Sequence, residues 1–371
     1  MLGPVDPTSA TKALSFAAKP AGWVWRRLRP DTSPSALDAV TDDLAAKVQK
    51  VERKRLLELQ VPQGLAIPVQ FDDLVRVEAP GPATMSGTLS SVAPFYQGLG
   101  DLKRMVVVGE PGSGKTVLIL HLILDLLENR KNHSDHLVPV RFNATGWDGT
   151  SSLSDFLLER LHAEYSLLMP VARALVESQR IVPIIDGLDE MDALGERPRH
   201  GIGAVECFNR PEWATYPLVV TCRREAYEKI QANRDGAGIA SSTVLGLKPL
   251  PTTEIIKHVQ NRIKDQGAGA GYARSLEAMV KRLEADPSGA LGVTLQTPWM
   301  LTLALSYLRD VDPSDAVRLI QSESQEAITD QLFAAQIPAA CAHQPGTRMN
   351  GGTPSRMSST GRVLLPSLSA R

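Results

Sequence analysis

The sequence predicts an α/β fold, with a parallel sheet and helices on both of its faces, followed by a small all-α helical domain. Three observations lead to this fold class. Short apolar runs alternate with helical patterns between residues 102 and 250, which is typical of a parallel sheet with right-handed crossovers. A glycine-rich loop joins the first apolar run to a helical pattern. Beyond Thr252 the periodicity is helical only.

The segments before the sheet are predicted to be a leader, a helix and a linker. Residues 1–33 are rich in Pro, Ala and Ser, which is typical of a flexible leader. Residues 34–60 carry apolar side chains at three-to-four spacing behind Ser35, a plausible N-cap, so they are predicted to form a long helix. Residues 61–101 combine charges with Pro and Gly and are interpreted as a linker.

The α/β domain is predicted to span residues 102–250. Its candidate strands are the apolar runs Met105–Val108, Val138–Asn143, Ile181–Ile185, Leu218–Cys222 and Thr243–Leu247. The helical patterns between them are Gly114–Arg130, Leu153–Tyr165, Val171–Gln179 and a less regular segment after Asp192. Because ligands of such sheets bind at the carboxyl ends of the strands, we expect the polar residues that follow these runs to share one cleft.

The helical domain is predicted to span residues 251–337. Its helical patterns are Glu254–Gln266, Ser275–Ala285, Val293–Leu308 and Pro313–Ala335, with a flexible joint at Gly267–Gly271. Residues 338–371 have no apolar periodicity and are predicted to be disordered.

Composition narrows the classes of function. The chain has 371 residues, of which 43% are hydrophobic and 22% charged, as is ordinary for a soluble globular protein. Its formal net charge of -1 gives no support for nucleic-acid binding. No segment reaches the ~18 apolar residues that a membrane span needs, and no signal peptide is recognised. The cysteines Cys207, Cys222 and Cys341 form neither a disulfide framework nor a zinc pattern, so we expect a cytoplasmic protein.

The glycine-rich loop fits the phosphate-binding pattern G-x-x-x-x-G-K-[ST] at each of its fixed positions. Its residues are Gly109, Glu110, Pro111, Gly112, Ser113, Gly114, Lys115 and Thr116. Glycines allow backbone N–H groups to turn toward phosphates, and the N-terminus of the following helix adds partial positive charge. Lys115 is expected to reach the β- and γ-phosphates, and the Thr116 hydroxyl is expected to bind Mg²⁺. The sequence therefore predicts a P-loop for a nucleoside triphosphate.

Acidic residues follow the apolar run Ile181–Ile185. Asp186 stands at the expected strand end, where P-loop enzymes place a carboxylate that holds Mg²⁺. Asp189 and Glu190 come one turn later, where a carboxylate can orient and deprotonate the attacking water. The alternative is an acidic turn that only ends a core strand.

Arg223 directly follows another apolar run, Leu218–Cys222. Its guanidinium can read a γ-phosphate and stabilise the charge that develops there. The alternative is that Arg223 and Arg224 form a solvated strand end.

Together these motifs resemble the NACHT family of STAND P-loop NTPases, in the form found in actinobacterial signalling and defence proteins. The likeness covers roughly residues 35–340. It is carried by GEPGSGKT (109–116), VPVRFNATGW (138–147), IVPIIDGLDEMD (181–192) and LVVTCRRE (218–225), with support from LKPL (247–250) and TPWMLTLAL (297–305).

The resemblance implies that ATP·Mg²⁺ binds between the α/β domain and the helical domain. It implies that Asp186 serves Mg²⁺, that Asp189 and Glu190 serve hydrolysis, and that Arg223 senses the γ-phosphate. It further implies that Pro298 packs on the nucleotide base. Members of the family usually continue into a winged-helix domain and a sensor region. The chain is therefore interpreted as truncated, with last residues that read like a shifted reading frame.

The leading hypothesis is a signalling NTPase that binds and slowly hydrolyses ATP in defence or regulation. It would switch between two domain arrangements and self-associate through its NTPase domain. Its trigger and effector are not named by the sequence. The alternatives are a small-molecule kinase, which would need an acceptor-binding lid, and a nucleotide-binding scaffold that does not hydrolyse ATP.

Overall fold

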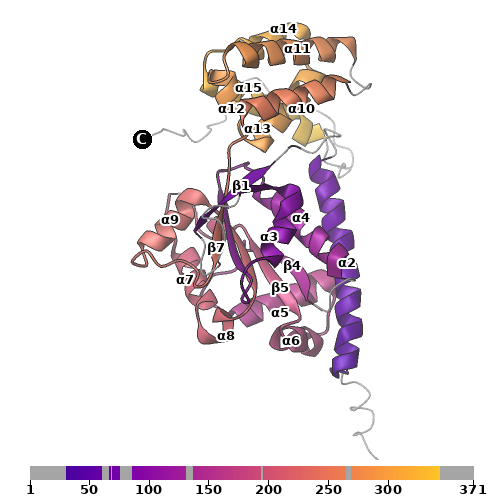
Figure 1. Cartoon of the computed structure of the whole chain (residues 1–371), viewed down its shortest axis with the longest axis vertical. Helices are drawn as coiled ribbons and strands as arrows, with labels where there is room; N and C mark the ends of the chain where they lie inside the picture. Colours follow the sequence, from indigo (N-terminus) through magenta and orange to yellow (C-terminus); the bar gives the residue numbers. More distant parts are fainter. Residues whose placement is uncertain are drawn as a thin grey trace, which may run out of the picture.

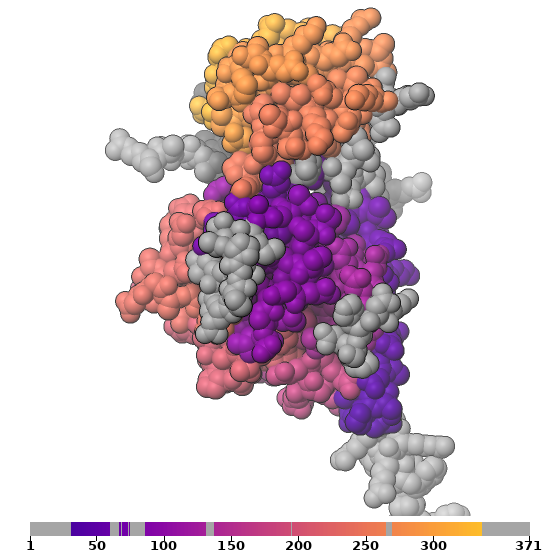
Figure 2. All heavy atoms as spheres, in the orientation of Figure 1, coloured from indigo at the N-terminus to yellow at the C-terminus, as the bar shows by residue number. Residues whose placement is uncertain are grey.

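The computed structural model describes residues 31–60, 67, 69–75, 86–130, 137–193, 195–264 and 269–342. These residues form a larger α/β part and a smaller helical part, which lie one above the other in Figure 1 and appear as two lobes in Figure 2. Each part has its own hydrophobic core. Most of the predicted leader, parts of the predicted linker and joint, and tail residues 343–371 lie outside the described residues.

A mixed sheet forms the centre of the α/β part and, within the described residues, has seven strands in the order β2-β1-β7-β3-β6-β5-β4. The strands are β1 (Gln70–Val75), β2 (Ser86–Thr88), β3 (Arg104–Gly109), β4 (Val138–Asn143), β5 (Ile181–Asp186), β6 (Leu218–Arg223) and β7 (Thr243–Leu247). Strands β3 to β7 pair in parallel, which confirms the predicted parallel sheet. They correspond to the five predicted runs because helices cover both faces, so Val and Ile side chains are buried on either side.

Strands β1 and β2 differ from the sequence prediction, which interprets residues 61–101 as a linker. β1 pairs antiparallel with both β2 and β7. β2 has only three residues, too few for a recognisable alternation, and β1 contains two consecutive aspartates. Phe71 of β1 is nonetheless buried and lies edge-to-face with Phe95, with ring centroids 5.6 Å apart. The segment forms an edge of the sheet because tertiary pairing overrides a weak local pattern.

Helices cover both faces of the sheet, as predicted (Figure 1). α3 (Val92–Gln97), preceded by the 3₁₀ helix η1 (Leu89–Ser91), and α4 (Lys115–Asn129) lie on one face, and α2 (Pro34–Gln60) packs against α4. The other face carries α5 (Leu153–Tyr165), α7 (Arg199–Phe208) and α9 (Arg224–Ala232), with α6 (Met169–Glu177) and α8 (Pro211–Ala214) between them in the chain. Because α4 contacts both the sheet and α2, it is apolar on nearly all sides.

The first turn of α2 differs slightly from the prediction. The hydroxyl of Ser33, rather than that of Ser35, accepts a hydrogen bond from the main-chain N–H of Ala36 at 3.4 Å. Pro34 is the first helical residue, where its missing N–H group is not needed. The helix therefore begins one residue before its predicted cap.

The helical part contains α10 (Thr252–Lys264), α11 (Ala270–Ala285), α12 (Ala290–Thr294), α13 (Pro298–Asp310), α14 (Pro313–Ile320) and α15 (Gln325–Ala342). The pattern predicted over Val293–Leu308 is interrupted because Pro298 lacks the N–H that a continuous helix needs. Thr297 instead caps α13 by accepting a hydrogen bond from the Met300 N–H at 3.3 Å. The pattern predicted over Pro313–Ala335 is likewise divided between α14 and α15.

Two helices extend into segments that are predicted to be flexible. α11 begins at Ala270, within the glycine-rich joint, and α15 ends at Ala342, so it includes residues 338–342 of the predicted tail. Alanine, the residue with the strongest helix preference, recurs at both of these helix ends. In the part of the chain that the structure describes, no helix combines the length and the apolar character that crossing a membrane requires.

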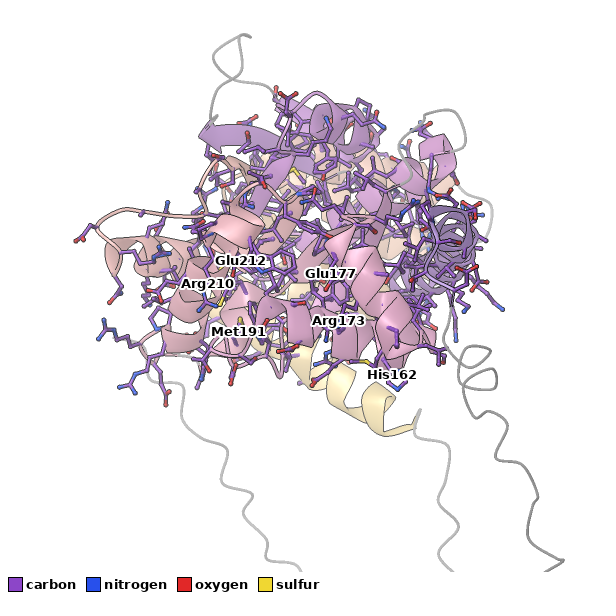
Figure 3. The ribbon with its side chains drawn as sticks, turned by 90° about the horizontal axis from the view of Figure 1, so that it is seen from below. His162, Arg173, Glu177, Met191, Arg210 and Glu212 are labelled. Atoms are coloured by element: carbon purple, nitrogen blue, oxygen red, sulfur yellow. The ribbon has the colours of Figure 1, made fainter. Side chains whose placement is uncertain are left out.

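A buried arginine links several chain segments at the amino ends of the parallel strands. Arg104 opens β3 and is 2% exposed. Its guanidinium donates hydrogen bonds to the main-chain carbonyl oxygens of Phe208, Trp213, Tyr216 and Ala240. Burial lowers the pKa of this group to about 10, so it stays charged at neutral pH. Figure 3 shows this end of the molecule from below, with labelled side chains of α6 and α8.

Candidate functional site

The carboxyl ends of the parallel strands face the helical part, and a cavity of about 420 Å³ lies between the two parts. This volume is in the range usual for small-molecule sites. The lining comprises residues 111–117, Asp186, Gly187, Asp189, Glu190, Thr221, Arg223, Pro298, Trp299 and Thr302, with Leu59, Ile67 and Val69 at the side. The predicted site residues all line this cavity except Gly109 and Glu110, which directly precede the lining residues of the P-loop.

The P-loop turns between β3 and α4 through two glycines in the left-handed conformation. Gly112 has a φ of 72° and Gly114 a φ of 95°, values that residues with a β-carbon rarely adopt. Gly114 is the N-cap of α4, so the unpaired N–H groups of the first helical turn lie beside the cavity. Ser113 Oγ is buried and makes no hydrogen bond within the described residues. These groups suit a ligand that brings several acceptor oxygens, as a phosphate does.

Lys115 is folded back onto its own loop. Its Nζ donates to the carbonyl oxygens of Gly109 at 2.8 Å and of Glu110 at 3.0 Å. Burial lowers the pKa of Lys115, and the carboxylate of Asp189 opposes this shift. A phosphate in the cavity would offer the ammonium a negatively charged partner, which binds it more strongly than two neutral carbonyl oxygens.

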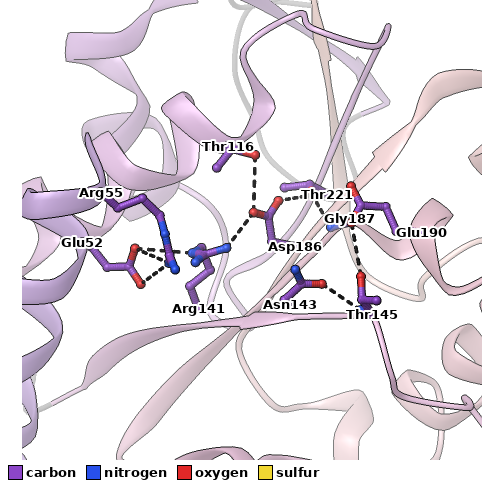
Figure 4. A network of polar contacts seen from close by, with 10 residues as sticks. All are labelled: Glu52, Arg55, Thr116, Arg141, Asn143, Thr145, Asp186, Gly187, Glu190 and Thr221. Carbon is purple, nitrogen blue, oxygen red and sulfur yellow. Dashed lines mark hydrogen bonds and ion pairs between the residues drawn. The ribbon is translucent and has the colours of Figure 1, made fainter. Parts of the chain in front are cut away.

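Asp186 ends β5 and is 9% exposed. Its Oδ1 accepts a hydrogen bond of 2.6 Å from the Thr221 hydroxyl, and its Oδ2 accepts one of 3.1 Å from Arg141 (Figure 4). The Thr116 hydroxyl lies 3.4 Å from the same Oδ2. A hydroxyl and a carboxylate oxygen side by side are ligands that Mg²⁺ takes in addition to phosphate oxygens. Thr116 and Asp186 therefore fit a magnesium ion.

A magnesium ion at Thr116 and Asp186 would take its remaining ligands from water and from the phosphates of a nucleotide. No group of three or more His, Cys, Asp or Glu side chains among the described residues is arranged to hold a metal ion. Mg²⁺ usually keeps several waters and binds through one or two carboxylates and substrate phosphates. The donor set at Thr116 and Asp186 agrees with that pattern.

The two acids after Asp186 have different partners. Asp189, whose side chain is 7% exposed, accepts from the main-chain N–H of Arg223 at 2.8 Å and lies 2.8 Å from its Nε. Glu190 is exposed at the cavity wall and accepts a hydrogen bond of 3.3 Å from the Thr145 hydroxyl. Both acids lie on the 3₁₀ helix η3 (Leu188–Met191). Asp189 therefore holds Arg223 in place, whereas Glu190 presents its carboxylate to the cavity.

The helical part contacts the P-loop directly through the start of α13. The main-chain N–H of Trp299 donates to the Gly112 carbonyl oxygen at 3.3 Å. A β-carbon built on Gly112 would lie 2.9 Å from the Trp299 Cβ, so the two backbones approach closely. Pro298 is the first residue of α13 and lines the cavity on the same side as Trp299. Trp299 is 47% exposed, and its ring lies beside that of Phe333, with centroids 5.3 Å apart.

Among the residues that sequence reasoning missed, Arg141, Thr145, Thr221 and Trp299 make contacts with the predicted site residues. Arg141 and Thr221 stand inside otherwise apolar runs, and a polar residue in a buried strand signals a specific partner. Thr145 follows the carboxyl end of β4, which is where site residues of such sheets gather. No local pattern marks Trp299 apart from its position beside Pro298.

A strand, a glycine-rich loop, a buried helix and a neighbouring acidic strand end around one cavity define the class of P-loop NTPases. Within that class, residues 103–266 match the family model of the NACHT domain. These residues therefore form a NACHT domain of the P-loop NTPase class, and binding of a nucleotide is the property that this domain implies.

Two further comparisons add little to this assignment. A search among curated proteins finds no match. Among solved structures, the chain is similar to that described as the crystal structure of Saccharomyces cerevisiae RIF2. The sequence identity is 11%, the match covers 65% of this chain and 86% of that chain, and the TM-score is 0.29. A likeness of this size carries no argument about function, which depends on the family and the site.

Proposed function

We propose that the chain is a signalling NTPase that binds ATP·Mg²⁺ in this cavity, hydrolyses it slowly and acts as a nucleotide-dependent switch. The observation that carries the proposal is the composition of the cavity wall. The P-loop, Asp186 and Arg223 come from the α/β part, while Pro298 and Trp299 come from the helical part. A nucleotide bound there touches both parts at once, so it can favour one arrangement of the two over another.

In this proposal the phosphates bind the P-loop. Lys115 leaves the two carbonyl oxygens of its own loop for the β- and γ-phosphates, and the N-terminus of α4 adds its partial positive charge. Thr116 and Asp186 hold Mg²⁺, which when bound neutralises part of the phosphate charge. Pro298, at the wall formed by the helical part, packs on the base.

Glu190 is the group that we assign to orient and deprotonate the attacking water. It is exposed, and its 3.3 Å contact with Thr145 is long, so its carboxylate can turn toward a water molecule. The side chain of Asp189 is 7% exposed and contacts Arg223 twice, which makes it a positioning residue in hydrolysis. It aims the Arg223 guanidinium, which stabilises the charge that develops on the γ-phosphate.

The switch uses the contact between the α/β domain, residues 102–250, and the helical domain, residues 251–337. This contact includes the hydrogen bond from Trp299 to Gly112, so a change in the P-loop alters how α13 docks. Self-association through the NTPase domain is the proposed output, with a role in defence or regulation in the cytoplasm.

Binding and turnover assays on matched variants test the proposal. Glu190→Gln is expected to bind ATP as the parent does and to release phosphate about 100-fold more slowly, because a general base acts only in the transition state. The variant Asp189→Asn is expected to lower turnover as well, since Arg223 loses its charged partner. Glu206→Gln, at an exposed position of α7, is the control and should keep full turnover.

Each alternative has its own signature in the same assays. Turnover of the Glu190→Gln and Asp189→Asn double variant at the parental rate would show that these acids form only a structural turn. Phosphoryl transfer to an added acceptor would identify a kinase. Nucleotide binding by the parent without phosphate release would identify a scaffold.

A further inference from the structure

Asp186 is linked to helix α2 through a buried row of charges. Glu52, on α2, is 1% exposed, and its carboxylate lies 3.4 Å from the Nε of Arg141 on β4. The Nη1 group of the same guanidinium lies 3.1 Å from Oδ2 of Asp186. Figure 4 shows these side chains running from α2 toward the end of β5, with Arg55 also beside Glu52.

The guanidinium of Arg141 contacts two carboxylates, those of Glu52 and Asp186. The side chain of Arg141 is 10% exposed and that of Asp186 is 11% exposed, so the charges are largely removed from water. Each carboxylate receives a different N–H group of the guanidinium. Buried charges are stable only when they are paired. A new charge placed beside this row therefore changes which of its members pair with one another.

A metal ion at Thr116 and Asp186 competes with Arg141 for one oxygen atom. Oδ1 of Asp186 is taken by the Thr221 hydroxyl, whereas Oδ2 faces both Thr116 and Arg141. A divalent cation on Oδ2 repels the guanidinium, which lies only 3.1 Å from that oxygen. Glu52 is the carboxylate already in contact with Arg141 that can take up its charge.

We propose that Arg141 is a positioning residue that exchanges between two carboxylates, holding Asp186 in the metal-free site and moving onto Glu52 when Mg²⁺ binds. This inference rests on the proposed role of Asp186 as a metal ligand. It makes α2 and the metal site thermodynamically coupled. Mg²⁺·nucleotide tightens the docking of α2, and docked α2 raises the affinity for Mg²⁺ by the same factor. Leu59 of α2 also lines the cavity, so this helix meets the site at two points.

Mg²⁺ titrations in the presence of a non-hydrolysable ATP analogue test the exchange. Glu52→Gln removes the charge that receives Arg141 and keeps the shape of the side chain, so the apparent Mg²⁺ affinity should fall about tenfold. Glu58→Gln is the control, because Glu58 lies on the same helix, its side chain is 64% exposed and its contact with Lys54 is 3.7 Å long. The control should keep the parental Mg²⁺ affinity, and both variants should keep the affinity for the analogue in EDTA.

Hydrogen exchange in α2 gives a readout that is independent of turnover. Mg²⁺ with the analogue should slow amide exchange around Glu52 about tenfold in the parent and in Glu58→Gln, and should leave it unchanged in Glu52→Gln. The double variant Glu52→Gln/Arg141→Met removes both charges of the Glu52–Arg141 pair, while Asp186 keeps its hydrogen bond from the Thr221 hydroxyl. It should bind Mg²⁺ at least as tightly as the parent, because nothing then competes for Asp186.

Three results would overturn the coupling. The first is that Glu52→Gln and Glu58→Gln bind Mg²⁺ with equal affinity. The second is that Mg²⁺ does not change amide exchange in α2 of the parent. The third is that the double variant binds Mg²⁺ as weakly as Glu52→Gln does. Asp186→Asn separates this failure from that of the proposed function. If Asp186→Asn keeps the parental Mg²⁺ dependence, Asp186 is not the metal ligand and both proposals fall. If it loses that dependence while Glu52→Gln behaves like the control, only the coupling falls.

Discussion

The two ends of the central sheet each contain an arginine that is largely removed from water, but the two arginines have different partners. At the amino end, Arg104 donates to main-chain carbonyl oxygens. At the carboxyl end, Arg141 lies between the carboxylates of Glu52 and Asp186. Carbonyl oxygens are neutral and held in place by the fold, whereas carboxylates can accept another cation. An arginine whose partners are main-chain carbonyl groups is therefore held in one position by the fold. An arginine whose partners are carboxylates can move between them when another cation binds.

The largest effect is expected at the amino end of the sheet. Arg104→Met fills much of the same volume but removes the charged donor from buried carbonyl groups, so the free energy of unfolding should fall by about 4 kcal/mol. Arg173→Met on α6 is the control, since the Arg173 side chain is 54% exposed and its loss should cost under about 0.5 kcal/mol. Urea unfolding followed by circular dichroism measures both values. Similar losses of unfolding free energy in the two variants would show that the hydrogen bonds of Arg104 do not stabilise this end of the sheet.

At the carboxyl end, a substitution should affect the ligand rather than the fold. ATP·Mg²⁺ at a hundred times its Kd should add about 2.7 kcal/mol to the stability of the parent. Lys115→Ala should abolish this gain and change the stability without nucleotide little, because the hydrogen bonds of its Nζ go to two neutral carbonyl oxygens. Thermal unfolding with and without nucleotide measures the difference. An undiminished gain in Lys115→Ala would place the nucleotide outside the P-loop.

The docking of the helical part on the P-loop is tested by two glycines with similar backbone angles. Gly112 and Gly236 have φ values of 72° and 83°, so an alanine at either position is strained by about 1–2 kcal/mol. Only at Gly112 would the new β-carbon meet Trp299, at 2.9 Å, while nothing lies within 4 Å at Gly236. Gly112→Ala should therefore cost about 1–2 kcal/mol more than Gly236→Ala. Equal unfolding free energies would mean that α13 does not rest on this loop in solution.

The smallest expected effect compares one histidine in each part, the half-buried His121 and the buried His258. Burial lowers the pKa of His121 on α4 and of His258 on α10 below the ordinary value of 6.5. Asp125 opposes the shift at His121, whereas Arg262 adds to the shift at His258. The unfolded chain then binds a proton more readily than the folded one, so stability is lost as the pH falls below about 6.5.

Substitution of each histidine separates the two contributions. His258→Gln should flatten the fall in stability between about pH 7.5 and pH 5.5 more than His121→Gln does, because the two causes of the shift at His258 act in the same direction. Urea unfolding across this range measures the slopes. A greater flattening in His121→Gln would contradict the assignment.

How far the sequence predicts the fold depends on how local each signal is. The parallel strands β3 to β7 are predicted correctly because each is a contiguous run of residues that is buried on both faces. β1 and β2 are missed because they form by pairing along β7, and little in their own residues marks them. The break between α12 and α13 is marked locally by Pro298, but the apolar pattern on either side hides it.

By itself the sequence determined the P-loop, the acidic residues after β5 and the order of an α/β part before a helical part, because contiguous residues at fixed spacing encode all three. Only the tertiary structure decided that Glu52 reaches Arg141, 89 positions away, and that Arg141 reaches Asp186, 45 positions away. It also decided that Asp189 binds Arg223 and that Trp299 rests on Gly112. Such contacts depend on strand order and on how helices pack across the sheet, and no local periodicity specifies either.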